Sequence, residues 1–427
     1  MTVSCTETWN RTLRWGTLPL ILVAGLAAAA PQPLRYETTA VRVQGADRTA
    51  RVPVGFVLEV LTEEMDEPRM LTFGPAGDLF AGSKDGAVYR LPPPYTRPQT
   101  LVDLSGYPHS VAFRDGEILI ARTDGLYRAP YRAGQESVPP GSVTLLAALP
   151  GGRGHTSRTV AVGPKGGIYA SLGITGNCSD QYLGEGYPFG DRRGGVLILE
   201  EPRGAAGKPR WRAFASGLRH PVGFAWHPRS HQLYASNNGP DHWGYELPPE
   251  VFCRLDPGSF QGMPWYQWDG TSLRRDGCIA RESPRPVSDV TPPVATFPAR
   301  SAPMGVAFVP DGALTVDLEG DAIVALHGSW GTQPTGGFFG NPATRRPPAL
   351  VVVRFEGAEA RRVEDLVTGF QLPDGDRWAR PVGVAVGPDG ALYFSSDKGT
   401  EGLFRLRRRG GDAVDGAQRR RTLGGRP

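Results

Sequence analysis

Five short motifs in this chain contain side chains that could transfer a proton or hold a charged ligand. Imidazole titrates near neutral pH, so His155 in the first motif is a candidate general base. Arg219 in the second motif is a permanent cation, which suits an anionic or electron-accepting ligand. The motifs, in chain order, are GHTSR at 154–158, SGLRHP at 216–221, NNGPD at 237–241, HGSW at 327–330 and RWARP at 377–381.

The third motif could bind a metal ion through its main chain. Carbonyl oxygens exposed at the Gly239-Pro240 turn are hard ligands of the kind that Ca2+ accepts. Each motif taken alone has a simpler structural explanation: a histidine bonded to a loop carbonyl, a surface arginine, a plain turn, or a tryptophan that fills space between strands. Their shared position in the fold is what favours a common site.

Six copies of one β-hairpin pattern carry these motifs at their beginnings or ends. Each copy is a short alternating apolar run, a turn rich in Gly, Pro and Asp, and a second alternating run. A hairpin repeated about every 40 to 80 residues is typical of a β-propeller with one blade per copy. We therefore predict an all-β, six-bladed β-propeller whose central channel collects the motifs. The copies begin at Met70, Ser110, Thr159, Val222, Met304 and Val382.

The composition agrees with a turn-dense all-β protein. The 427 residues include 57 Gly and 41 Pro, and no sustained helical pattern follows residue 30. Residues 405–427 contain eight Arg and two Asp, and their net positive charge exceeds the +4 of the whole chain. The remaining chain is therefore slightly acidic and does not offer a basic surface for binding nucleic acid. We assign 31–50 to a linker, 51–408 to the propeller and 409–427 to a basic disordered tail.

The N-terminal segment has the features of an export signal. Arg11 and Arg14 precede an apolar run that ends in small residues and is short for a membrane span. We assign 1–30 to a signal peptide cleaved near Ala30, with an uncleaved N-terminal anchor as the alternative. Either assignment predicts a periplasmic or secreted body, in an oxidising compartment, with no further membrane segment.

The cysteines support one predicted disulfide. Cys5 lies in the signal segment, whereas Cys253 and Cys278 flank a loop rich in Trp, Tyr and Gly. We expect a bridge between Cys253 and Cys278 in an oxidising compartment. Cys178 would then be unpaired, and without a CxxC motif or a Cys/His cluster in the sequence we do not expect it to bind metal.

The order and spacing of longer motifs resemble the pyrroloquinoline-quinone-dependent soluble sugar dehydrogenases, especially the sorbosone-dehydrogenase-like branch. The resemblance extends from about residue 55 to residue 407 and implies a propeller that binds pyrroloquinoline quinone and Ca2+. The motifs that carry it are VGFVLEVLTEEMDEPRMLTF, GLRHPVGFAWHP, NNGPDHWGYE with PGSFQGMPWY, HGSW, and ARPVGVAVGPDGALYFSSD.

The resemblance implies a role for each motif residue. His155 corresponds to the base that takes the hydroxyl proton while hydride passes to the quinone, and Arg219 to the cation that polarises the reacting quinone oxygen. The carbonyls of Gly239 and Pro240 correspond to ligands of the calcium that clamps the cofactor. Arg380 corresponds to an arginine that pairs with a cofactor carboxylate.

Further positions match the cofactor site with substitutions. The resemblance places Asn238 and Trp330 at the cofactor, together with His220, where the family usually has Asn. The carboxylate that orients the base in the glucose-oxidising branch falls at Ile174, so Asn177, Asp180 or a loop group would have to replace it. After HGSW this chain has Gly-Thr-Gln instead of Asn-Arg, and either Arg345 or Arg346 could return to the site.

The sequence therefore predicts an exported quinoprotein dehydrogenase. Its substrate would be a sugar-like alcohol, hemiacetal or aldehyde, and its electrons would pass to a quinone or a cytochrome. One alternative is a non-catalytic propeller that binds carbohydrate or a protein partner, which His220 and the altered loop after Trp330 favour. A calcium-dependent lactonase ranks last, because the predicted site motifs are poor in Glu and Asp.

Overall fold

The computed structural model describes residues 1–2, 32–202 and 207–410, and the strands lie in the compact unit that begins at Gln32. Nearly all of the predicted signal peptide and of the predicted tail lies outside these residues. Within the described parts of the chain, no helix is both long and apolar enough to cross a membrane.

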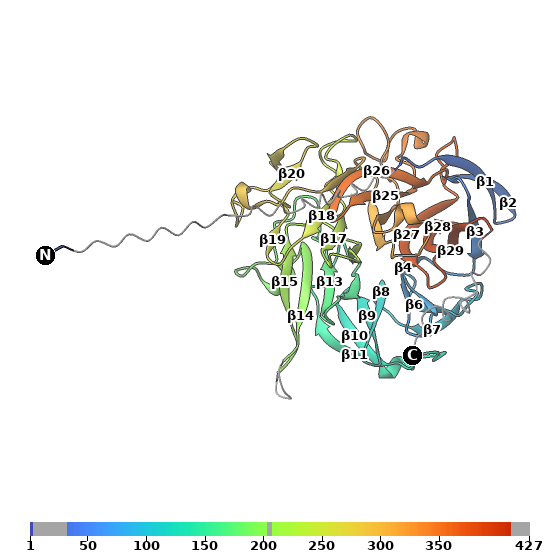
Figure 1. Ribbon diagram of the computed structural model, residues 1–427, viewed down its shortest axis with the longest axis horizontal. Helices are drawn as coiled ribbons and strands as arrows, with labels where there is room; N and C mark the ends of the chain where they lie inside the picture. Colours follow the sequence, from blue (N-terminus) through green and yellow to red (C-terminus); the bar gives the residue numbers. More distant parts are fainter. Residues whose placement is uncertain (3–31, 203–206, 411–427) are drawn as a thin grey trace. The chain divides into compact units, whose positions relative to one another are not determined.

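Six sheets, each built on four antiparallel strands, follow one another in chain order and confirm the predicted six-bladed β-propeller (Figure 1); the third sheet gains a short parallel fifth strand, β19 (Ser259–Phe260). Blade 1 contains β4 (Pro68–Phe73), β5 (Leu79–Ser83), β6 (Ala87–Leu91) and β7 (Gln99–Asp103). Blade 2 contains β8 (Ser110–Arg114), β9 (Glu117–Arg122), β10 (Gly125–Pro130) and β11 (Thr144–Ala148). Blade 3 contains β12 (Val160–Val162), β13 (Ile168–Leu172), β14 (Gly195–Glu200) and β15 (Arg210–Ser216).

The second half of the ring repeats this order. Blade 4 contains β16 (Phe224–Trp226), β17 (Leu233–Asn237), β18 (Glu250–Leu255) and β22 (Ala295–Phe297). Blade 5 contains β23 (Pro303–Phe308), β24 (Ala322–Leu326), β25 (Ala349–Glu356) and β26 (Glu359–Val367). Blade 6 contains β27 (Ala379–Val386), β28 (Leu392–Gly399), β29 (Gly402–Arg408) and, from the start of the chain, β3 (Phe56–Thr62).

The first strand of each blade lies at the centre of the array. Strand β27 packs against both β23 and β4, and β4 and β12 both pack against β8, so neighbouring blades meet along their first strands. Glycines allow this approach: a Cβ on Gly223 would lie 2.1 Å from the Met304 carbonyl oxygen, and one on Gly383 would lie 2.4 Å from that of Arg69. The repeated Val-Gly-apolar pattern of the later blades is therefore a requirement of inter-blade packing.

The residues before β3 differ from the prediction. Most of the predicted linker 31–50 forms a hairpin of β1 (Tyr36–Val43) and β2 (Ala46–Pro53). Val41 and Val52, on its two strands, are buried in the same hydrophobic core as blades 5 and 6. The apolar alternation in this segment places one face of the hairpin on the propeller.

The predicted Cys253–Cys278 disulfide is wrong. Cys178, Cys253 and Cys278 are all free thiols in the structure. Cys253 lies on β18 and is 2% exposed in the core of blades 3 and 4, where burial raises its pKa to about 12. Cys278 follows a separate hairpin of β20 (Tyr266–Trp268) and β21 (Leu273–Arg275), and its side chain lies next to Cys178.

Candidate active site

All the predicted site motifs lie in loops, or at the strand ends next to them, at the same end of the blades. In a four-stranded antiparallel blade, the loop before the first strand and the loop between the second and third strands emerge on one side. His155, Arg219 and Arg377 lie before β12, β16 and β27, whereas Asn238 and Gly328 lie in the β17–β18 and β24–β25 loops. Blade topology thus brings distant motifs to one face.

These loops enclose a cavity of about 210 Å3. It brings together six of the eight predicted site residues, while Pro240 adjoins the lining in sequence and Arg380 borders a neighbouring cleft. The cavity is lined by His155, Arg219, His220, Asn238, Gly239, Asp241, Glu250, Arg300, Ala302, Gly328, Ser329 and Trp330.

His155 is held in the tautomer that a general base requires. Its Nδ1 bonds to the carbonyl oxygen of Ile174, so the ring proton lies on Nδ1 and the lone pair on Nε2. Burial, followed by the positive charge of Arg219, lowers the pKa of His155 to about 3, so the ring is neutral at physiological pH. The Ile174 side chain cannot orient a base, but its main-chain carbonyl does.

His220 packs beside His155 and completes one wall of the cavity. The two ring centroids are 4.5 Å apart, and Gly173 packs against both side chains, where an added Cβ would lie 2.5 Å from the Cβ of His155 and 2.8 Å from Cδ2 of His220. His220 Nε2 lies 2.6 Å from the Ser157 hydroxyl oxygen. His220 is therefore held in place by close packing and a hydrogen bond.

Arg219 is a buried cation with defined acceptors. Its Nε and Nη2 donate to Asn177 Oδ1 at 3.0 and 2.6 Å, and Nη2 also donates to Asp241 Oδ2 at 2.9 Å. Burial lowers its pKa from the usual arginine value, while the carboxylate of Asp241 opposes that shift. Asn177, one of the suggested partners of His155, therefore orients Arg219 instead.

Oxygen atoms gather at the predicted metal motif. Glu250, at the start of β18, is 4% exposed and accepts a hydrogen bond from the Gly239 main-chain nitrogen. Burial raises the pKa of Glu250 to about 7. Asn238 Oδ1 is buried and has no hydrogen-bond partner. Asp241 of the same motif also lines the cavity, and with Glu250, which lies outside the motifs, the cavity holds two carboxylates although the motifs themselves are poor in Glu and Asp.

Three lining residues were missed by sequence reasoning, and two of them, Glu250 and Arg300, are charged. Arg300 is 6% exposed, donates to Asp241 Oδ1 at 2.9 Å, and lies with its guanidinium carbon 5.8 Å from the centre of the Trp330 ring. Both lie outside the motifs, Glu250 after a Pro-Pro pair and Arg300 before β23. Their positions at or just before the start of a strand were the one available signal, since the other site residues also lie next to strand ends.

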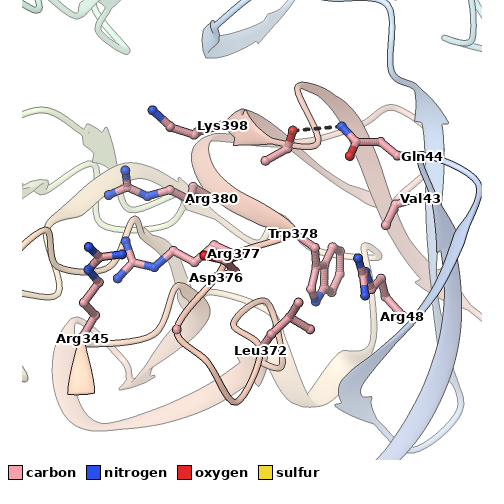
Figure 2. Close-up of a pocket in the computed structure, with 12 residues that line it drawn as sticks. Val43, Gln44, Arg48, Arg345, Leu372, Asp376, Arg377, Trp378, Arg380 and Lys398 are labelled. Carbon is pink, nitrogen blue, oxygen red and sulfur yellow. Dashed lines mark hydrogen bonds between the residues drawn. The ribbon is translucent and has the colours of Figure 1, made fainter. Parts of the chain in front are cut away.

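Arg380 lies between this cavity and a second cleft of about 380 Å3 (Figure 2). It donates to the carbonyl oxygens of His327 and Gly328 at 3.0 and 3.1 Å, and Gly328 lines the first cavity. The cleft contains one carboxylate, Asp376, and five cations, which are Arg48, Arg345, Arg377, Arg380 and Lys398. Burial and neighbouring arginines lower the pKa of Arg377 to about 9 and that of Arg380 to about 10. An anion would relieve this repulsion.

The two arginines of the inserted loop after Trp330, Arg345 and Arg346, have different surroundings. Arg345 lines the cationic cleft, whereas Arg346 pairs with Glu246. Trp330 is 42% exposed, and its ring lies 4.3 Å from that of Phe338, which is 72% exposed. The loop thus adds a cation beside Arg380 and an exposed aromatic pair at the rim of the cavity.

The fold and the site together define the structural class of this protein, which is a six-bladed propeller with a polar cavity at one end of its blades. A family model described as TrAA12-like matches residues 285–409. A curated protein of Borreliella burgdorferi, described as uncharacterized, is 23% identical over 375 residues, which is 84% of this chain and 90% of that protein.

Solved structures show the same fold. The calcium structure of a Trichoderma reesei family AA12 carbohydrate-active enzyme matches with a TM-score of 0.70 and 17% identity, over 89% of this chain and 100% of that chain. The holo form of the pyranose dehydrogenase PQQ domain from Coprinopsis cinerea matches with a TM-score of 0.65 and 19% identity, over 89% and 99%. The apo form of the soluble aldose sugar dehydrogenase from Escherichia coli matches with a TM-score of 0.58 and 16% identity, over 83% and 100%.

These matches confirm the resemblance that the motifs indicated. The chain is similar to the TrAA12-like family model over residues 285–409, and it shares its fold with solved structures of a family AA12 enzyme, a pyranose dehydrogenase domain and an aldose sugar dehydrogenase. They do not single out the sorbosone-dehydrogenase-like branch.

Proposed function

We propose that this chain is an exported dehydrogenase that oxidises a sugar-like alcohol, hemiacetal or aldehyde by hydride transfer to calcium-bound pyrroloquinoline quinone. The observation that carries the proposal is the pairing of a neutral His155, protonated at Nδ1, with the buried cation of Arg219 in one cavity. A base and a fixed positive charge are what removal of a hydroxyl proton and a hydride requires.

The residues present fit both groups. The unpartnered Oδ1 of Asn238 and the main chain of Gly239 and Pro240 offer oxygen atoms to Ca2+, next to the carboxylate of Glu250. The quinone carries three carboxylates, and Arg380 with Arg377 offers planar guanidinium donors for them. When bound, this cofactor would supply the hydride acceptor.

The chain's own residues would divide the remaining work. His155 would accept the hydroxyl proton at Nε2, because Nδ1 is occupied by its bond to Ile174. Arg219, held by Asn177 and Asp241, would stabilise the negative charge that develops during hydride transfer. Carboxylates brought in by the quinone would also raise the low pKa of His155 by offsetting the nearby cations.

A reconstitution experiment tests this proposal. Apoprotein is titrated with quinone and Ca2+ while the quinone absorption is recorded, and dye reduction is then assayed with several aldoses and aldehydes. We expect binding by both the native protein and His155→Gln, with turnover reduced about 10²- to 10⁴-fold in the variant. Absence of any spectral change on adding the quinone would refute the proposal.

A non-catalytic carbohydrate-binding propeller is the second candidate. The exposed pair Trp330 and Phe338 favours it, because aromatic faces at a cavity rim suit sugar rings. In that case the native protein would bind a sugar without turnover, and His155→Gln would bind it equally well. A quinone or cytochrome as electron acceptor belongs to the first proposal only, whereas export to the periplasm or medium, which the N-terminal segment predicts, is common to both.

A further inference from the structure

Three metal-ligating side chains that the proposed reaction does not use lie together near the cavity. Cys178, His242 and Cys278 each offer one ligand atom, and these three atoms lie within 4.8 Å of one another. The residues come from three separate segments: the β13–β14 loop, the β17–β18 loop and the residues after β21. We propose that Cys178, His242 and Cys278 form a zinc site.

A buried carboxylate orients this histidine. His242 Nε2 lies 3.0 Å from both carboxylate oxygens of Asp276, which is 1% exposed. The same carboxylate accepts hydrogen bonds from the main-chain nitrogen of Cys278 and from Gln267 Nε2, each at 3.1 Å. Metal-bound histidines generally donate their second ring nitrogen to such a carboxylate, and the bond at Nε2 leaves Nδ1 as the nitrogen for a metal.

The ligand types select the metal. Two sulfur atoms and one imidazole nitrogen suit Zn2+, whereas Ca2+ requires oxygen ligands. Three protein ligands leave a fourth tetrahedral position for water. The thiol and imidazole cluster is therefore chemically distinct from the oxygen atoms around Gly239.

Two of the ligands adjoin the residues that hold Arg219. Cys178 follows Asn177 in the sequence, and His242 follows Asp241. The side chains of Asn177 and Asp241 accept hydrogen bonds from Arg219 at 2.6 to 3.0 Å. The Asn177 carbonyl oxygen also lies 3.9 Å from Cys278 Sγ. A zinc ion bound here would tie the two loops together and keep both acceptors of Arg219 in place. Its role would be positional, since the ligands do not line the cavity.

Metal analysis of the full chain tests the zinc site. The protein is loaded with Zn2+ under reducing conditions, desalted and analysed by elemental mass spectrometry, and we expect one zinc per chain. Titration with Co2+ should give the absorption of thiolate-to-cobalt charge transfer and of tetrahedral cobalt. Cys178→Ser and His242→Ala should each lose stoichiometric zinc, and Asp276→Asn should weaken zinc binding about 10- to 100-fold.

Cys253→Ala is the matched control, because Cys253 lies in the core of blades 3 and 4 and is absent from the cluster. It should retain the zinc and the cobalt spectrum, and circular dichroism should show that every variant is folded. A disulfide-linked peptide of Cys178 and Cys278, with no zinc taken up after reduction, would overturn the proposal. Native zinc content in folded His242→Ala would do so as well. Neither readout uses turnover, so the result is independent of the proposed quinone chemistry.

Discussion

The ring proton of His155 is held at Nδ1 by a main-chain carbonyl, and the buried site keeps the ring uncharged. A side-chain carboxylate could do the same work, but a carbonyl does it without adding a charge. The neighbouring cation, Arg219, is instead anchored by Asn177 and Asp241. Charge at the site is thus distributed so that the base and the cation have separate partners.

His155 should make the stability of the protein depend on pH. The pKa of His155 is about 3 in the folded protein, which lies below its value in the unfolded chain. Its contribution to the free energy of unfolding is therefore fully present above pH 6.5 and is lost as the pH falls. Between pH 7 and pH 5 this amounts to about 2 kcal/mol. Glu250 acts in the opposite direction, because its pKa is raised to about 7 and its contribution is lost as the pH rises.

The comparison with His155→Gln isolates the histidine contribution. Urea unfolding of both proteins at pH 7 and pH 5 should show that the native protein loses about 2 kcal/mol more than the variant over this interval. Equal pH dependence in the two proteins would show that His155 is not held neutral.

The elements of the fold place the site by a simple geometrical rule. Each blade directs the loop before its first strand and the loop after its second strand to one end, and these loops carry the site residues. The first strands also bring the blades into direct main-chain contact. Hydroxyl groups support this contact, since Ser236 Oγ donates to the Met304 carbonyl oxygen at 2.6 Å and Ser395 Oγ to that of Arg69 at 2.5 Å.

Gly383→Ala should disrupt the contact between blades 6 and 1. The added Cβ would lie 2.4 Å from the Arg69 oxygen and 2.7 Å from the Leu71 nitrogen, and main-chain atoms cannot rotate away. We expect a loss of about 1–3 kcal/mol in the free energy of unfolding. Gly141→Ala is the control, because nothing lies within 4 Å of its added Cβ, and chemical denaturation of both variants measures the difference.

At the scale of the whole molecule, the ring is closed by strands from opposite ends of the sequence. Strand β3 pairs antiparallel with β29, and Glu59 on β3 forms ion pairs with Arg405 and Arg407 at 2.8 and 2.6 Å. Leu58 lies opposite Leu406 and is 3% exposed. Because every blade contacts its neighbours, this closure should stabilise the complete propeller.

Leu58→Ala tests this closure. We expect a loss of about 2–5 kcal/mol and one cooperative transition at a lower temperature, because the cavity weakens the joint between the two ends. Val54→Ala, at a position 53% exposed, should change the stability by no more than about 0.5 kcal/mol. A separate minor transition in Leu58→Ala, with the main transition unchanged, would show that β3 is only an accessory strand.

The sequence by itself determined the six blades and the five motif positions. Alternating apolar residues and Gly-containing turns are local signals, so each hairpin could be predicted from its own segment of the sequence. The strand order within a blade then predicted that the motifs lie at one end of the blades. The same local signals did not identify the β1–β2 hairpin, which was assigned to a linker although it packs on blades 5 and 6.

Only the tertiary structure decided which loops meet. The His155 ring bonds to the main-chain carbonyl of Ile174, and the Glu250 carboxylate accepts a hydrogen bond from the main-chain nitrogen of Gly239. A sequence motif, which is a pattern of side chains, does not reveal such contacts with main-chain atoms. Cys278 was paired with Cys253 because the two flank one aromatic-rich loop, yet the packing of neighbouring blades 3 and 4 places it beside Cys178, a hundred residues earlier in the chain. The contacts between loops follow from the order of the blades around the ring, and spacing within any one motif carries no information about them.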